Sequence, residues 1–113
     1  MNINNIVRTY MAQIMNDEDF LKHVAELIER QLHEWDLDYK VYIMKLKDYE
    51  VVVKNNEQYY EVKLSNQELE VLRFKGLYNL DHRIWTELMD QGLPIMEGYG
   101  NYMETVLPEI YKS

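Results

Sequence analysis

The chain has 113 residues, of which 47% are hydrophobic and 28% charged, and its formal net charge at pH 7 is -8. This length and composition fit one domain with a hydrophobic core and exclude a disordered chain. Cysteine does not occur, which excludes disulfides, thiolate nucleophiles and Cys-ligated zinc, and we expect a reducing, cytoplasmic location. No segment reaches the roughly 18 apolar residues of a membrane span, and residues 1–10 do not resemble a signal peptide.

Two helices are predicted at the start of the chain. Apolar residues at steps of three and four indicate a short amphipathic helix and comprise Ile3, Ile6, Val7, Tyr10 and Ile14. Asn16 can cap a second helix, since Asp17, Glu18 and Asp19 then lie in its first turn, where the helix dipole favours anions. The apolar stripe of this second helix comprises Leu21, Val24, Ala25, Ile28, Leu32 and Trp35.

Residues 39–64 alternate with period two and predict a three-stranded antiparallel meander. A two-residue turn at Lys47-Asp48 would pair Met44 with Val51 and place Lys45 opposite Glu50. A second turn at Asn56-Glu57 would pair Val51 with Val62 and Glu50 with Lys63, whereas a turn one residue earlier would oppose two acids. The core face expected from this register comprises Tyr42, Met44, Leu46, Tyr49, Val51, Val53, Tyr60, Val62 and Leu64.

The last third of the chain contains all four glycines and both prolines and is expected to be the most segmented part. Ser65 and Glu68 form a capping box for a helix that ends at Gly76. Another helix is predicted from Asp81 to about Gln91. A short one would follow Asn101, with Pro108 bending or interrupting it. The expected fold is therefore a single α+β domain over residues 1–113, with two N-terminal helices, the meander and two to three C-terminal helices (ααβββαα).

The segment EGYGNYME, residues 97–104, could be a ligand-gripping loop or a hinge that lets the last segment fold back. A phosphate-binding loop needs basic or hydroxyl-bearing side chains nearby, and the only charged residues in this segment are Glu97 and Glu104. Gly98 and Gly100 are more simply explained as residues with positive φ in turns before the cap. We interpret the segment as a hinge.

The sequence lacks recognisable catalytic machinery. Ser65 is committed to a cap, and no HExxH, EF-hand or Walker pattern occurs. His33 with Glu29 could touch a metal, but a solvated histidine is the simpler interpretation. Asp81 fits a first-turn anion better than a catalytic acid. We therefore expect no enzymatic activity, no catalytic residue, no cofactor and no metal.

Acidic residues concentrate in residues 16–38, where eight of them face only Lys22 and Arg30. A field of this sign repels nucleic acid and favours a protein partner with a basic surface. The ten tyrosines are a second feature, because exposed tyrosines make good interface anchors. The hypothetical partner-binding residues are Glu18, Glu26, Glu29, Glu34, Asp36, Asp38, Tyr59, Tyr99 and Tyr102. Alternatively, the acids only solvate a helix face, and a C-terminal arm uses Tyr99 and Tyr102 to cover the second face of the sheet.

Three functions follow from these patterns. The first is a small acidic adaptor or inhibitor that acts by protein contact. The second is a nucleic-acid mimic that inhibits a DNA-binding enzyme, with the spaced acids imitating phosphates. The third is a small-ligand-binding or enzymatic domain with a pocket between sheet and helices. The oligomeric state stays open.

Two short stretches carry a resemblance to a family. MNINNIVR at residues 1–8 and VVVKNNEQYYEV at residues 51–62, followed by helices, look like small acidic type II-A anti-CRISPR proteins. The resemblance implies a bacterial or phage inhibitor and slightly favours the mimic; whether the gene belongs to a phage or to its host stays open. The chain departs from that family by a whole additional helix, by lacking glycine after Asn55-Asn56, and by having no dense acidic cluster between its final helices.

Overall fold

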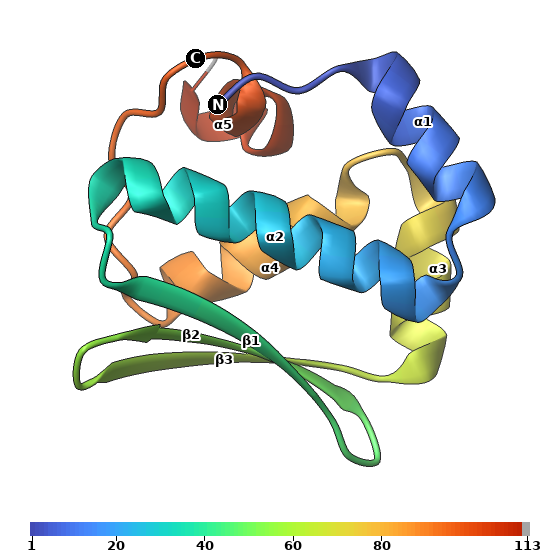
Figure 1. The fold of residues 1–113 in the computed structure, drawn as a ribbon, viewed down its shortest axis with the longest axis horizontal. Helices are drawn as coiled ribbons and strands as arrows, with labels where there is room; N and C mark the ends of the chain where they lie inside the picture. The colour runs from blue at the N-terminus through green and yellow to red at the C-terminus, as the bar shows by residue number, and fades with distance from the viewer. Residues whose placement is uncertain (112–113) are drawn as a thin grey trace.

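The computed structural model describes residues 1–111 and has the expected α+β order (Figure 1). Its helices and strands are α1 Asn5–Ile14, α2 Asp17–Trp35, β1 Tyr39–Lys45, β2 Tyr49–Asn55, β3 Gln58–Leu64, α3 Asn66–Lys75, α4 Asn79–Asp90, α5 Tyr102–Val106 and α6 Pro108–Tyr111. The three strands form one antiparallel sheet in the order β1-β2-β3. The fold class predicted from the sequence is confirmed.

Capping residues start α2 and α3 where the sequence predicts, whereas Asn101 makes no side-chain cap bond at the start of α5. The Asn16 side chain accepts the Asp19 N–H at 2.8 Å at the start of α2. At the start of α3, Ser65 and Glu68 bond each other's backbone N–H groups in a complete capping box. Pro108 interrupts the last helical segment, since α5 ends at Val106 and α6 begins with the proline itself. Local side-chain hydrogen bonding therefore fixes these boundaries without help from distant residues.

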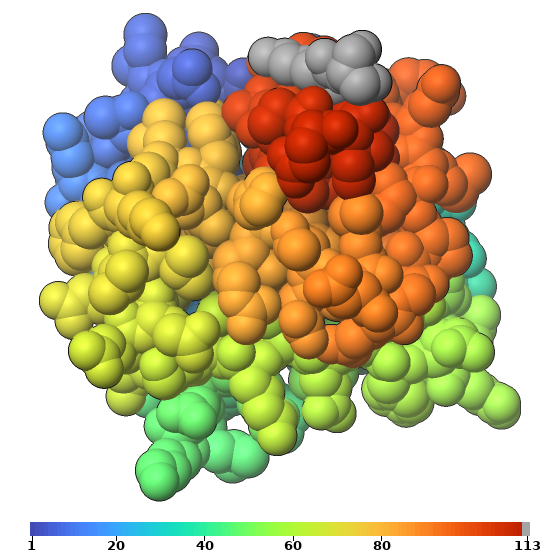
Figure 2. Space-filling view, turned by 180° about the vertical axis from the view of Figure 1, so that it is seen from behind, coloured from blue at the N-terminus to red at the C-terminus, as the bar shows by residue number. Residues whose placement is uncertain are grey.

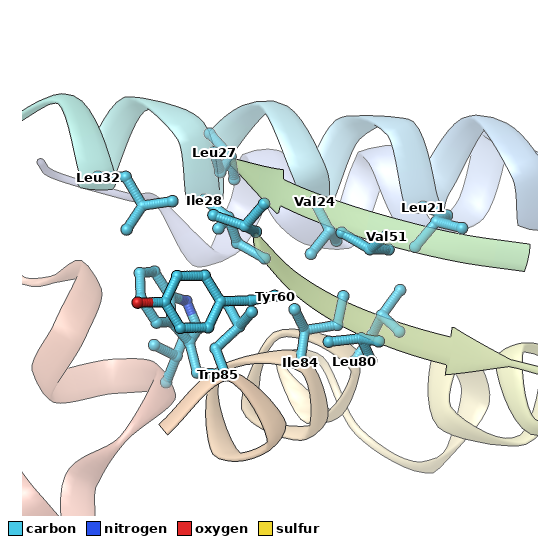
Figure 3. Close-up of a cluster of buried hydrophobic side chains, with 14 of the residues drawn as sticks. Leu21, Val24, Leu27, Ile28, Leu32, Val51, Tyr60, Leu80, Ile84 and Trp85 are labelled. Atoms are coloured by element: carbon cyan, nitrogen blue, oxygen red, sulfur yellow. The ribbon is translucent and has the colours of Figure 1, made fainter. Parts of the chain in front are cut away.

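The core lies between one face of the sheet and the helices α2 and α4 (Figure 3). Leu21, Val24 and Ile28 point from α2 toward Val51 of β2, and Ile84 of α4 approaches from the other side. All five side chains are fully buried. Burying an aliphatic side chain of this kind contributes about 1.5–3 kcal/mol, so this layer is the main source of stability.

The β2–β3 register is confirmed. Val51 pairs with Val62 and Glu50 with Lys63, whose ammonium lies 3.7 Å from the Glu50 carboxylate. Asn56 has a φ of 55° in the turn, a left-handed conformation that asparagine tolerates better than most residues. The hairpin of the structure is therefore the one that avoids placing two acids opposite each other.

The β1–β2 register differs from the prediction by one residue. Val51 pairs with Ile43, not with Met44, because the turn takes three residues, Leu46 to Asp48, instead of two. A slip of one residue turns every side chain of a strand to the opposite face. The predicted core positions are therefore solvent-exposed in the structure: Tyr42 at 47% and Met44 at 45% on β1, and Leu46 at 69% in the turn. Tyr39, Val41 and Ile43 face the core in their place.

The EGYGNYME segment holds the first residues of the chain. The Tyr102 N–H donates to the Met1 carbonyl at 3.1 Å, and the Ile3 N–H donates to the Asn101 side chain at 2.7 Å. Gly100 has the expected positive φ of 76°, and a Cβ there would lie 2.7 Å from the Met1 carbonyl oxygen. Gly98 does not have a positive φ; a Cβ there would lie 3.0 Å from the side chains of Gln31 and Met103. Close packing therefore accounts for Gly98, and positive φ together with close packing accounts for Gly100.

The chain folds back after this segment, but up to residue 111 it does not reach the second face of the sheet. Figure 1 shows α5 beside the N-terminus, on the side of α2 and α4 away from the sheet. Tyr102 is completely buried there, and Tyr99 is 79% exposed. The alternative in which a C-terminal arm covers the sheet with these two tyrosines is therefore wrong.

Candidate interaction surface

Helix α1 is anchored by a buried arginine. Arg8 is 3% exposed, and its guanidinium donates to both carboxylate oxygens of Asp81 on α4, at 2.6 and 2.9 Å. It also donates to the Leu77 carbonyl at 3.1 Å and lies 4.6 Å from the ring centroid of Tyr78. Two-pronged pairing of this kind offsets the cost of burying a guanidinium.

The Arg8–Asp81 pair belongs to a longer buried network. The Tyr102 hydroxyl donates to Asp81 at 2.8 Å, and the Trp85 indole N–H donates to the Tyr102 oxygen at 3.1 Å. Burial, together with the negative charge of Asp81, raises the pKa of Tyr102 well above its ordinary value. Asp81 does lie in the first turn of α4, as predicted, but sequence reasoning missed Arg8. The signal that could have found it is that Arg8 is the only charged residue between Met1 and Asn16.

Because Arg8 faces inward, the apolar stripe of α1 faces water. The exposed fractions are 80% for Ile6, 50% for Val7, 58% for Tyr10 and 58% for Ile14. The apolar stripe of an amphipathic helix normally packs against the core. In α1 the opposite side packs, so the stripe is a solvent-facing apolar surface of the kind that marks interaction sites.

Helix α3, which lies beside α1, also exposes apolar side chains. Phe74 is 71% exposed and Val71, one turn earlier, is 54% exposed. Arg73 connects the two helices, because its guanidinium donates to the Ala12 carbonyl at 2.6 Å and lies 5.1 Å from the Phe74 ring centroid. Figures 1 and 2 show α1 and α3 side by side at one end of the molecule. We name Ile6, Val7, Tyr10, Ile14, Val71 and Phe74 the α1–α3 apolar surface.

A shallow hollow of about 400 Å³ runs along the exposed side of α1. It is lined by Asn5, Ile6, Thr9, Tyr10 and Gln13, none of which is charged. Depletion of charge at the centre, with aromatic side chains and neutral hydrogen-bonding groups, is typical of protein interfaces.

The acidic candidates do not share one surface. Glu34 accepts the Tyr99 N–H at 2.9 Å and pairs with the terminal ammonium of Met1 at 2.5 Å, so it holds the N-terminal segment. Glu29 accepts the Val41 N–H at 2.7 Å on the opposite flank of α2. Glu18 lies 3.7 Å from the Lys45 ammonium. A row of free phosphate-like charges is not formed by these three residues.

The remaining acidic candidates lie near the exit of α2 or on its outer side. Hydrogen bonds from the Asp38 N–H and from the Asn55 side chain lower the pKa of Asp36. Asp38 and Glu26 are exposed. Most of the acidic segment therefore supports local structure, which gives the nucleic-acid mimic little support.

The three candidate tyrosines have different environments. Tyr59 is 58% exposed on the open face of the sheet, where the Lys54 ammonium lies 5.6 Å from its ring centroid. Tyr99 is exposed in the loop before α5. Tyr102 is 0% exposed and cannot contact a partner in this conformation, so its prediction as an interface residue is wrong.

The described residues form neither a metal cluster nor a membrane-spanning helix. Within residues 1–111, no three histidine or carboxylate side chains converge as a metal ion would require. His33 instead lies 2.7 Å from the Tyr39 carbonyl oxygen. In the same part of the chain, every helix is too short or too polar to cross a membrane. Core side chains fill the interior between the sheet and α2 (Figure 3). Hollows between sheet and helices, as the third function would need, are open ones beside β1 and α2, of about 270 Å³, and beside β3 and α4, of about 420 Å³.

Comparisons with known proteins add no family. No protein-family model matches the chain, and searches of curated proteins and of solved structures find no match.

Proposed function

We propose that the protein acts by contact with another protein, as an adaptor or inhibitor without intrinsic catalysis, and that the α1–α3 apolar surface is the centre of this contact. The observation that carries the proposal is the orientation of α1, which has its only charge inside and its apolar side in water. Fully burying a side chain such as Ile6 or Tyr10 against a partner would contribute about 1.5–3 kcal/mol.

The partner that fits this surface is a protein with an apolar patch and a basic margin. Asp19 is exposed in the first turn of α2, directly after α1, and Glu70 is exposed one turn before Phe74 on α3. Together with the net charge of -8, these acids would draw a basic surface toward the apolar centre. Aromatic and aliphatic anchors supply affinity, while charges at the rim act chiefly on the association rate.

The buried polar groups also favour a non-catalytic function. Arg8, Asp81, Tyr102 and Trp85 bond one another completely inside the molecule. Groups engaged in this way stabilise a fold and are not free to exchange protons with a substrate.

Two tyrosines of equal exposure provide a matched test. Tyr10 lies on the α1–α3 apolar surface and Tyr59 on the open face of the sheet, and each is 58% exposed. A partner captured from the native cell should be purified and its affinity measured for wild type, Tyr10→Glu and Tyr59→Glu. We expect Tyr10→Glu to weaken binding by at least about tenfold, equivalent to about 1.4 kcal/mol, and Tyr59→Glu to change it little.

Other outcomes have definite meanings. If only Tyr59→Glu lost binding, the partner would contact the open face of the sheet, and the proposal would be overturned. If wild type self-associates in light scattering and Tyr10→Glu is monomeric, a second copy occupies the surface instead of a different partner. Circular dichroism of both variants should remain that of wild type, since both side chains are exposed.

A further inference from the structure

The two edges of the sheet are protected to different extents. At β3, the Gln91 side chain accepts the Glu61 N–H at 3.0 Å and donates to the Glu61 carbonyl at 2.5 Å. This side-chain amide makes the same pair of hydrogen bonds as a neighbouring strand would. The β3 edge is thus closed at its centre. Proteins commonly cover sheet edges in this way, which prevents another strand from adding to the sheet.

The β1 edge is closed only in its first half. The Val41 N–H donates to Glu29, so Val41 points its backbone groups away from β2, and His33 contacts the Tyr39 carbonyl on the same edge. Along an antiparallel strand, the N–H and C=O groups of successive residues point alternately toward the neighbouring strand and away from it. The N–H and C=O of Ile43, two residues after Val41, therefore also point away from β2. Within residues 1–111, no side chain or backbone group bonds these outward groups of Ile43.

A groove of about 270 Å³ lies between β1 and α2, beside Val41 and Ile43. The groove is lined by the apolar residues Ala25, Val41 and Ile43 and by the charged residues Lys22, Glu26 and Glu29. The ammonium of Lys22, one of these lining residues, lies 3.9 Å from the Glu18 carboxylate, and the ammonium of Lys45 lies 3.7 Å from it. Within residues 1–111, neither Glu26 nor Glu29 forms an ion pair, and Glu29 accepts the Val41 N–H, so both carboxylates lack a cationic partner.

We propose that β1 accepts an extended, basic segment of a partner protein as a fourth strand of the sheet. The incoming backbone would bond the outward groups of Val41 and Ile43, and every second side chain would enter the apolar groove. Glu29 would exchange its bond with the Val41 N–H for a lysine or arginine of the incoming strand. An acidic strand could not form the ion pair with Glu29, and Glu26 would repel it as well. The charge of the strand therefore decides whether it binds.

This docking edge is separate from the α1–α3 apolar surface, so its test does not depend on the proposed function. The probe is a blocked nine-residue peptide in which valine alternates with lysine and threonine. Its control has the same sequence with each lysine replaced by glutamate. Amide NMR spectra of the labelled full chain, recorded during each titration, report the residues that respond, and hydrogen exchange reports new backbone bonds.

We expect the basic peptide to shift the amides of Val41 and Ile43 and to slow exchange at Ile43, with the β3 amides unchanged. The acidic peptide should bind at least about fivefold more weakly, and the double variant Glu26→Gln/Glu29→Gln should abolish that difference. Both glutamines retain the side-chain size, and Glu26 is exposed, so the fold should persist. Equal binding of both peptides, shifts confined to β3 or to the open sheet face, or no binding of the basic peptide would each overturn the proposal.

Discussion

Helices α1 and α2 follow one another with only Met15 and Asn16 between them, and both have an apolar stripe at helical spacing. In α2 the stripe is the packed side, and Leu21, Val24 and Ile28 are completely buried. In α1 the stripe faces water, and the packed side contains Arg8. Periodicity therefore predicts that a segment is helical and has two sides, but the side that packs depends on what the rest of the fold offers.

The polar side of each helix explains the difference. The polar side of α2 carries many charged side chains. In the described part of the chain, no buried group of opposite charge pairs with them, and they remain at or near the surface. The polar side of α1 has a single charge, for which α4 supplies Asp81 and the loop before it supplies the Leu77 carbonyl. A complete set of partners makes burial of Arg8 tolerable, and the apolar stripe is then left outside.

The largest effect is expected from removing the partner of Arg8. Asp81→Ala would leave a buried guanidinium without its carboxylate and should lower the free energy of unfolding by about 3–5 kcal/mol. Urea denaturation measures this loss. Asp90→Ala, at the exposed end of α4, is the control and should change stability by no more than about 0.5 kcal/mol. Equal, small effects would mean that Arg8 does not anchor α1.

The sheet allows a second test of which side of an apolar pattern packs. Val51 is 0% exposed and Met44 is 45% exposed. Val51→Ala should cost about 1–3 kcal/mol because it creates a cavity in the core. Met44→Ala should stay within about 0.5 kcal/mol, although Met44 has the larger side chain. A larger loss from Met44→Ala would restore the register predicted from the sequence.

A smaller effect is expected from His23, which lies on the side of α2 near Arg8. Burial of the imidazole, with the positive charge of Arg8 adding to it, lowers the pKa of His23 below its ordinary value. The unfolded chain then binds more protons than the folded chain, so stability is complete above about pH 6.5 and declines as the pH falls toward the folded-state pKa. Proton NMR should show His23 titrating below about 6.5, and His23→Gln should make the decline between pH 7 and 5 shallower. A His23 pKa above about 6.5 would contradict this account, because it would mean that Arg8 lies farther from the imidazole.

Local signals predicted most of the fold. The Asn16 cap, the Ser65–Glu68 capping box and the charge pairing of Glu50 with Lys63 each involve residues close in sequence or in one hairpin, and all are confirmed. The β1 register could not be chosen in this way, because both alternating sets of β1 side chains are largely apolar. Only the length of the turn distinguishes them.

The candidate site was less accessible to sequence reasoning. The exposure of the α1 stripe depends on a contact between residues 8 and 81, and no local pattern encodes that distance. The acidic residues were visible as a group in the sequence, but Glu29 and Glu34 occupy opposite flanks of α2 and bond different segments. Composition located the charge without showing which carboxylates were already engaged.

The central claim is that α1 packs through Arg8 and presents its apolar stripe to solvent, and two isoleucines test it most directly. Ile6 of α1 is 80% exposed and Ile28 of α2 is 0% exposed. The measurement is the free energy of unfolding in urea for Ile6→Ala and for Ile28→Ala. The account predicts a change within about 0.5 kcal/mol for Ile6→Ala and a loss of about 2–5 kcal/mol for Ile28→Ala. A loss of similar size in both variants would contradict it, because the apolar stripe of α1 would then be part of the core.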